Sequence, residues 1–208
     1  MIVIVNYGIG NLDSVARAFR ACEAEAVVSS RPEDIDQADG IVLPGVGSFA
    51  KAMQNLNEGG LLAALNRRVI EQQTPILGIC LGFQMFTKGS EEGGVDGLGW
   101  IDAETRRFDF SRQHQPCKIP HMGWNDLHAQ KAGPLFEGIH ADACFYFAHS
   151  YCVSCNDECA VLATTDYGYE FVSAVERGNI FGTQFHPEKS HANGLKILKN
   201  FIGCIQHG

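Results

Sequence analysis

The feature that most constrains the fold is an apolar run at residues 75–84. It contains one cysteine, with a glycine two residues before it and another two residues after it. Residues 76–79 show no polar alternation, which is typical of a parallel strand covered on both faces. Residues 81–86 then have helix-compatible spacing. The pattern therefore predicts a buried strand that leads into a helix, with Cys80 at the junction.

A cysteine at such a strand-to-helix turn has the setting of a nucleophile. The tight backbone there requires small neighbours, which Gly78 and Gly82 provide. At the start of a helix the sulfur lies near unpaired amides and the positive end of the macrodipole, which stabilise the thiolate. The Leu81 amide would point at an oxyanion. The alternative is a buried structural cysteine, because a short glycine–cysteine pattern has a high false-positive rate.

A second pattern supplies a base for that nucleophile. Apolar residues 181–185 lead into His186, Pro187 and Glu188. A cysteine nucleophile needs a base, and the base needs an orienting group. On an extended segment His186 and Glu188 point the same way, so the carboxylate would fix the imidazole tautomer, with Pro187 holding that geometry. A structural histidine is the alternative for His186 taken alone.

The order of elements predicts an α/β fold with a doubly wound, mostly parallel open sheet, helices on both faces, and an antiparallel strand region in the C-terminal half. Strand 1–5 precedes a helix over 12–23 capped by Asn11, as in doubly wound sheets. The remaining expected strands are 26–28, 40–43, 99–108, 117–119, 144–153, 161–165, 171–176 and 179–185, and the remaining helices are 49–56, 61–73 and 192–205. A single domain over residues 1–208 suits this length.

Composition excludes several kinds of partner. The net charge of −8, without a cluster of basic residues, argues against nucleic acid and against an anionic membrane. No secretory leader opens the sequence and no apolar run has the length of a membrane helix, so we expect a cytoplasmic protein. Its eight cysteines should then stay reduced.

The two chemical patterns together resemble a known family. Residues 78–84 and 184–188 are similar to the nucleophile and histidine motifs of the class I (triad) glutamine amidotransferases. Within that family, four further segments resemble the glutaminase subunits of imidazole glycerol phosphate synthase: residues 6–12, 43–49, 120–125 and 149–151. The resemblance extends over nearly the whole chain.

The resemblance implies a reaction and assigns residues to it. Glutaminases of this family hydrolyse L-glutamine to glutamate and ammonia with a triad, here Cys80, His186 and Glu188. The oxyanion donors would be the amides of Val46 and Leu81, although the glycine-rich loop that contains Val46 could also be a simple turn. The residues implied in substrate binding are Gly47, Gln84, His149, Ser150 and Tyr151. No cofactor is implied.

The resemblance also implies a partner. Ammonia released into water becomes ammonium, which is not a nucleophile, so such enzymes pass it directly to a synthase. This chain has no room for a synthase domain, and we expect a separate cyclase subunit, in a heterodimer that makes imidazole glycerol phosphate and AICAR in histidine biosynthesis. The implied interface residues are Tyr7, Asn11, His121, Met122, Trp124 and Lys189.

Three cysteines allow a competing interpretation of one segment. Cys152, Cys155 and Cys159 have a spacing that suits zinc or an iron–sulfur cluster, with Cys144 or His149 as a fourth ligand. Against a metal, Cys152 lies in an expected strand, residues 156–158 have turn composition, and the family has no metal there. We expect none.

Some residues depart from the family pattern. Asn6 and Phe83 stand where the family usually has aspartate and methionine. Residues 99–104 and 188–191 look more like paralogues that supply ammonia to sugar amidotransferases in surface-polysaccharide biosynthesis, so that partner is the alternative. Two further alternatives are a self-sufficient cysteine hydrolase or peptidase and a non-catalytic binding module, although such a module would be expected to lack a triad residue.

Overall fold

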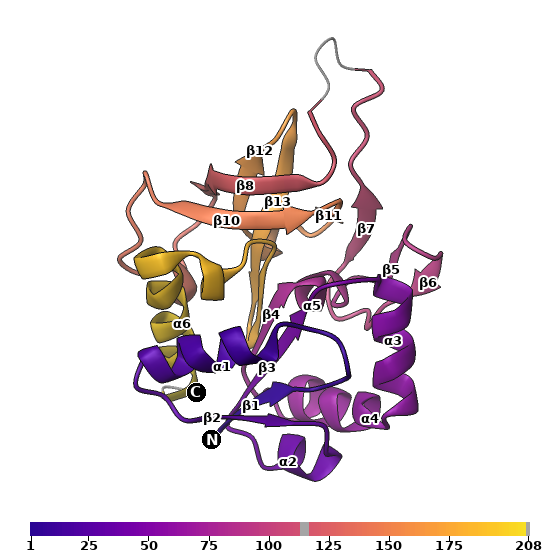
Figure 1. Ribbon diagram of the computed structural model, residues 1–208, viewed down its shortest axis with the longest axis vertical. Helices are drawn as coiled ribbons and strands as arrows, with labels where there is room; N and C mark the ends of the chain where they lie inside the picture. Colours follow the sequence, from indigo (N-terminus) through magenta and orange to yellow (C-terminus); the bar gives the residue numbers. More distant parts are fainter. Residues whose placement is uncertain (113–116, 207–208) are drawn as a thin grey trace.

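A computed structural model describes residues 1–112 and 117–206 (Figure 1). Residues 113–116 and 207–208, which the predicted single domain includes, lie outside the described residues. The main sheet has the strand order β2-β1-β3-β4-β14-β13-β11-β7-β5-β6. Among the described helices, none is long and apolar enough to cross a membrane.

The first half of the sheet is parallel and its central strands are buried on both faces. These strands are β2 (Ala26–Ser29), β1 (Ile2–Val5), β3 (Gly40–Gly45), β4 (Ile76–Cys80) and β14 (Ile180–Thr183). Every residue of β1, β3, β4 and β14 is buried, which explains their unbroken apolar sequences. The carboxyl ends of β1, β3 and β4 lie at one edge of the sheet.

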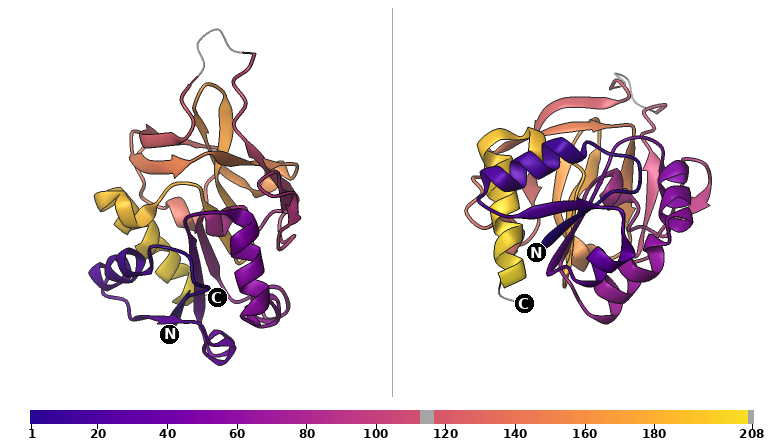
Figure 2. Two further views of the ribbon diagram at one scale, coloured as in Figure 1. Left: turned by 45° about the vertical axis from the view of Figure 1, so that its right-hand side comes forward. Right: turned by 60° about the horizontal axis from the view of Figure 1, so that its bottom comes forward.

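Helices cover both faces of this parallel half (Figures 1 and 2). On one face lie α1 (Leu12–Ala21) and α6 (His191–Gln206). On the other lie α2 (Pro32–Asp36), α3 (Phe49–Glu58), α4 (Leu61–Asn66) and a π-helical turn, η1 (Arg67–Glu71). Each face has its own cluster of buried apolar side chains. The predicted doubly wound arrangement is therefore confirmed.

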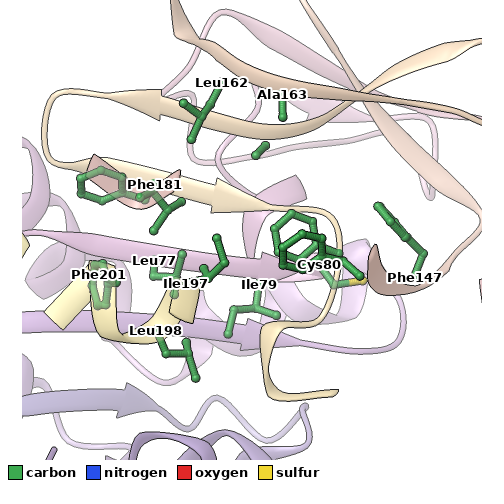
Figure 3. Close-up of a cluster of buried hydrophobic side chains, with 14 of the residues drawn as sticks. Leu77, Ile79, Cys80, Phe147, Leu162, Ala163, Phe181, Ile197, Leu198 and Phe201 are labelled. Atoms are coloured by element: carbon green, nitrogen blue, oxygen red, sulfur yellow. The ribbon is translucent and has the colours of Figure 1, made fainter. Parts of the chain in front are cut away.

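Figure 3 shows the cluster on the α1 and α6 side. Leu77 and Ile79 of β4 belong to the same buried cluster as Leu198 and Phe201 of α6. Cys80 lies at one end of this cluster, near Phe147. Packing in the core therefore holds Cys80, the candidate nucleophile, at the end of β4.

The second half of the sheet is mainly antiparallel, as predicted. It contains β13 (Glu170–Arg177), β11 (Tyr151–Cys155), β7 (Ala103–Arg107), β5 (Gly89–Ser90) and β6 (Val95–Asp96). In addition, β12 (Val161–Asp166) pairs with β13, and β9 (His128–Ala129) pairs with β12. One pair in this half, β5 with β7, is parallel. Short 3-10 turns occur at η2 (Pro134–Phe136), η3 (Glu158–Ala160) and η4 (Pro187–Lys189).

A separate two-stranded ribbon, β8 (His121–Asp126) with β10 (Cys144–His149), crosses this region (Figure 1). Two strand predictions here were wrong. Residues 117–119 are not a strand, and pairing begins only after Pro120, which has no backbone N–H to donate. Residues 144–153 form two strands, because at Ser150 the chain leaves the ribbon and β11 joins the main sheet.

Helix predictions differed mainly at their ends. The first helix ends at Ala21, before Glu23, whose φ of 59° is not helical. The segment predicted as one helix over 61–73 is α4 followed by η1. The helix expected over 81–86 is a single turn, α5 (Leu81–Gln84). The last of these changes matters for the site described next.

Candidate active site

Cys80 occupies a strained turn between β4 and α5. Its φ of 53° and ψ of −106° are unusual for a residue with a side chain. A methyl group on Gly82 would lie 1.7 Å from the Leu43 carbonyl oxygen, so only glycine allows α5 to approach β3 this closely. The predicted elbow is confirmed. Because α5 has only one turn, its macrodipole is small and neighbouring side chains must contribute more to stabilising a thiolate.

His186 and Glu188 form a buried pair. The Nδ1 of His186 lies 2.8 Å from Oε1 of Glu188, and their side chains are only 1% and 2% exposed. The segment is not extended as predicted: His186 precedes the 3-10 turn of η4, which Pro187 begins. The fixed φ of proline suits this turn, and the turn brings the carboxylate back to the ring.

Opposing influences act on the pKa of His186. Burial alone would lower it, but the charge on the nearby Cys80 sulfur and the hydrogen bond with the Glu188 carboxylate together outweigh burial and raise that pKa to about 10. Burial, and then the same charge on Cys80, raises the pKa of Tyr7, whose hydroxyl donates to the Pro44 carbonyl. His186 is therefore arranged to hold a proton beside the Cys80 sulfur.

The other imidazole nitrogen is available for proton transfer. Within the part of the chain that the structure describes, Nε2 of His186 is buried and has no hydrogen-bond partner. Because Nδ1 faces Glu188, a proton on Nε2 can be transferred only toward the sulfur side of the ring. This is the geometry of a general acid beside a nucleophile.

A cavity of about 220 Å³ opens beside the Cys80 sulfur. It contains every residue that was predicted to form the oxyanion site or to bind substrate: Val46, Gly47, Leu81, Gln84, His149, Ser150 and Tyr151. Four further residues line it that were not predicted as part of the oxyanion or substrate site, namely Glu92, Pro120, Met122 and Ala148. A free amino acid fits a site of this size and polarity.

Glu92 gives the cavity a negative charge. One of its carboxylate oxygens accepts a hydrogen bond from the Phe49 amide at 2.8 Å, which places the acidic group at the N-terminus of α3. Glu92 lies in a turn-rich segment with no recognisable motif. No local sequence signal identifies it, because its role depends on the packing of that turn against α3.

Two buried glutamines lie behind the sulfur. Gln84 donates through Nε2 to the Tyr151 carbonyl at 2.9 Å and to Oε1 of Gln184 at 3.0 Å. Gln184, which is fully buried, directs its own Nε2 toward the Cys80 sulfur at 3.6 Å. Gln184 stood inside a recognised motif, but its contact with Cys80 spans 104 positions of the chain and has no sequence signal.

His149 and His121 form a second buried pair at the cavity wall. Nδ1 of His149 lies 2.7 Å from the Tyr151 carbonyl, so it must donate, and Nε2 then accepts from Nδ1 of His121 at 3.0 Å. Burial lowers the pKa of His149 to about 3 and that of His121 to about 4. Both rings are neutral at physiological pH and fix the position of the cavity wall.

The residues predicted to contact a partner divide into two groups. Met122 and Trp124 are 64% and 49% exposed, and Asn11 and part of Lys189 also reach the surface. The side chains of Tyr7 and His121 are buried instead, each held by a hydrogen bond inside the protein. The place of these two residues at the partner interface stays a prediction, in which their backbone and not their side chains would face the partner. Alternation along β8 explains the difference for His121 and Met122.

The three cysteines considered as metal ligands do not form a site. Burial raises the pKa of Cys152 to about 12, Cys155 is half-buried beside the Asp157 carbonyl, and Cys159 is exposed. Across residues 1–112 and 117–206, no group of three His, Cys, Asp or Glu side chains could hold a metal ion.

Comparison with known proteins places the chain in a family. Residues 3–204 match the family model described as glutamine amidotransferase class-I. The chain belongs to the class I glutamine amidotransferases. This agrees with the resemblance found in its motifs.

Several of the similar proteins are HisH subunits of imidazole glycerol phosphate synthase. The chain is 49% identical over 203 residues to imidazole glycerol phosphate synthase subunit HisH 1 of Campylobacter jejuni, covering 97% of this chain and 99% of that protein. It is 44% identical over 205 residues to subunit HisH 2 of Pseudomonas aeruginosa, covering 99% and 100%. Among solved structures, a glutamine amidotransferase matches with a TM-score of 0.75 at 20% identity, covering 99% of this chain and all of that one.

Proposed function

We propose that this amidotransferase is the glutaminase subunit of imidazole glycerol phosphate synthase and hydrolyses L-glutamine to glutamate and ammonia. The observation that carries the proposal is the group of Cys80, His186 and Glu188 at a cavity of about 220 Å³. The full-length similarity to HisH subunits supports the choice of synthase. We further propose that residues 1–208 form one amidotransferase domain.

The reaction uses these three side chains in two stages. The Cys80 thiolate attacks the side-chain amide carbon of glutamine, and His186 gives the proton on Nε2 to the leaving ammonia. A water molecule then attacks the resulting thioester, with His186 as its base, and glutamate leaves as the sulfur regains its charge. Glu188 keeps the ring in the required orientation throughout because its carboxylate accepts a hydrogen bond from Nδ1–H.

Each stage passes through an oxyanion that needs hydrogen-bond donors. We assign this role to the backbone amides of Val46 and Leu81, which lie at the ends of adjacent strands and line the same cavity. Removal of one such donor typically lowers the rate about 100- to 1000-fold.

The remaining cavity residues suit an amino-acid substrate. Glutamine carries an α-ammonium group, for which the Glu92 carboxylate is a suitable partner. Both N–H groups of the Gln84 amide donate to oxygens of the protein, so its Oε1 remains free to accept a hydrogen bond from the substrate. Gly47 and the backbone of residues 149–151 complete the binding site that we propose.

The partner surface that we propose lies on the outer face of β8. Met122 lines the cavity and is also 64% exposed, so one residue joins the site to the surface. Trp124, on the same strand, adds exposed aromatic area of the kind found at interface centres. We place the cyclase subunit of a heterodimer here, with Asn11 and Lys189 at its border. The eight unpaired cysteines suit the reducing cytoplasm.

Glutamine-to-glutamate turnover tests the proposal. We would measure it for the chain alone, with the cyclase subunit and its ribonucleotide acceptor, and with a sugar amidotransferase. Strong stimulation by the cyclase supports histidine biosynthesis. Stimulation only by the sugar amidotransferase would overturn the choice of synthase while keeping the glutaminase chemistry.

Two cysteine variants identify the nucleophile. Cys80→Ala should abolish turnover, whereas Cys144→Ala, a matched change at an exposed cysteine, should leave turnover unchanged. Ammonia release by Cys80→Ala would show that the nucleophile is assigned wrongly.

A further inference from the structure

Gln184 is a fully buried amide beside the nucleophile, and both ends of that amide have partners. It follows β14 directly and precedes His186 by two residues. Its Oε1 accepts from Nε2 of Gln84 at 3.0 Å, and its Nε2 lies 3.6 Å from the Cys80 sulfur. Buried side-chain amides normally have hydrogen-bond partners, and the partner of this Nε2 is the Cys80 sulfur.

The orientation of this amide follows from its neighbours. Gln84 donates to two oxygens, the Tyr151 carbonyl and Oε1 of Gln184. Reversing Gln84 would place its oxygen against the Tyr151 carbonyl, and reversing Gln184 would place two amide nitrogens together. The Tyr151 carbonyl is itself held by Nδ1 of His149 at 2.7 Å. The nitrogen of Gln184 therefore faces the sulfur.

We propose that Gln184 is a further catalytic residue of the glutaminase reaction, which donates a side-chain N–H to the Cys80 sulfur and so favours the thiolate and fixes its direction of attack. This inference rests on the proposed function, because it assigns a role at the same site. The residues that hold Gln184 in place, Gln84 and Tyr151, act through it as positioning groups.

The chemistry of the sulfur explains why a donor is useful here. A thiolate accepts a hydrogen bond better than a thiol or a thioester does, so the N–H of Gln184 stabilises the charged sulfur before attack. It stabilises the sulfur again when the thioester breaks and the electron pair returns to Cys80. The one-turn helix α5 supplies little of this stabilisation.

Other charged or titratable groups around the sulfur must be kept in view. They are Tyr7 after β1, Glu92 across the cavity, His149 at the end of β10, and His186 with Glu188 before α6. Gln184 differs from all of them because it is uncharged, so its contribution does not change with pH. Its removal should shift the ionisation of Cys80 without adding a new titration.

The test is the pH dependence of Cys80 alkylation by iodoacetamide in the full chain, followed by mass spectrometry of the peptide that contains Cys80. Gln184→Met removes the donor and keeps a similar volume. We expect the alkylation pKa to rise by about one unit, which makes the reaction about tenfold slower below that pKa, with little change in the high-pH rate.

A matched control separates this effect from general disturbance of the core. Thr183→Val alters the neighbouring buried residue, whose hydroxyl donates to the Phe185 carbonyl at 3.1 Å. It removes one internal hydrogen bond, as Gln184→Met does, but no contact with the sulfur. Its alkylation profile should match that of the unmodified chain.

A second variant keeps the test informative if Gln184→Met does not fold. Gln184→Glu has the same shape and still accepts from Gln84, but it places an oxygen beside the sulfur, so the alkylation pKa should rise further than in Gln184→Met. An unchanged alkylation pKa in either folded variant would overturn the proposal. Alkylation does not require glutamine turnover, so the two proposals fail in different ways. If only the proposed function is wrong, no synthase will stimulate turnover, but the alkylation pKa will still rise in the Gln184 variants.

Discussion

Substitution of Gly82 by alanine tests the elbow most directly. The added methyl carbon would lie 1.7 Å from the Leu43 carbonyl oxygen and 2.7 Å from its carbonyl carbon. Ordinary contact begins at 3.4 Å, so α5 has to move away from β3 by roughly 1.7 Å. Both obstacles are backbone atoms, so no side chain can turn aside. We expect the free energy of unfolding to fall by about 3 kcal/mol, the upper end of the usual overpacking range.

The same displacement should damage catalysis more than stability. Cys80 and Leu81 directly precede Gly82, so the sulfur and one proposed oxyanion amide move with α5. A misplacement of 1 Å costs about 100-fold in rate, and we expect at least that loss in kcat/KM of the complex with its synthase. Urea unfolding gives the stability change and glutamate formation gives the rate.

Gly203 provides the matched control for Gly82→Ala. It lies in α6, and among the described residues an added methyl carbon would have no heavy atom within 4 Å beyond its chain neighbours and the backbone of the helix itself. Gly203→Ala should raise the free energy of unfolding by about 0.5–1 kcal/mol, because alanine loses less backbone entropy in a helix. A Gly82→Ala protein with the unfolding midpoint and activity of the unmodified chain would refute the close-approach argument.

Three further results are expected. Glu188→Gln should lower kcat by about 10³- to 10⁴-fold in steady-state assays of a folded protein, since it removes the charge that orients His186; a loss below tenfold would contradict this. Protonation of His186 stabilises the fold fully below about pH 6.5, and this stabilisation is lost as pH rises through about 10. Cys80→Ala removes the main cause of the raised pKa, so unfolding at several pH values should show a weaker decline across that window, and an equal decline would count against the ion pair. Trp124→Ala should weaken binding to the synthase about 30-fold, or about 2 kcal/mol, by calorimetry, whereas Val28→Ala, an exposed apolar change on β2, should not; equal effects would place the interface elsewhere.

The central part of the fold was predictable because its strands are buried on both faces. β4 reads as an unbroken apolar run and its end is marked by two glycines that packing requires. The ribbon of β8 and β10 was harder to predict because the two faces of β8 do not follow the usual rule of apolar side chains inside and polar side chains outside. Met122 and Trp124 face outward although they are apolar, while His121 faces inward although it is polar.

The candidate site was predictable where its residues occur in short motifs. The prediction was incomplete where residues meet only through tertiary packing. Cys80 and the His186–Glu188 pair occur in short patterns, whereas the angle between His186 and Glu188 depends on a 3-10 turn that alternation does not reveal. Glu92 and the sulfur contact of Gln184 exist only through tertiary packing. Hydrogen bonds between positions so far apart in the chain leave no periodic signal in a single sequence.

The position of β14 also bears on how the chain matures. β14 is the last strand in the sequence, yet it lies between β4 and β13. During synthesis, β4 therefore waits for its neighbour while about 100 residues are added, which takes roughly 5–20 s at typical translation rates. The same interval separates Cys80 from His186, the base that we propose for it, so a nascent chain that ends before β14 lacks the complete triad. The proposed site is assembled only when β14 enters the sheet beside β4.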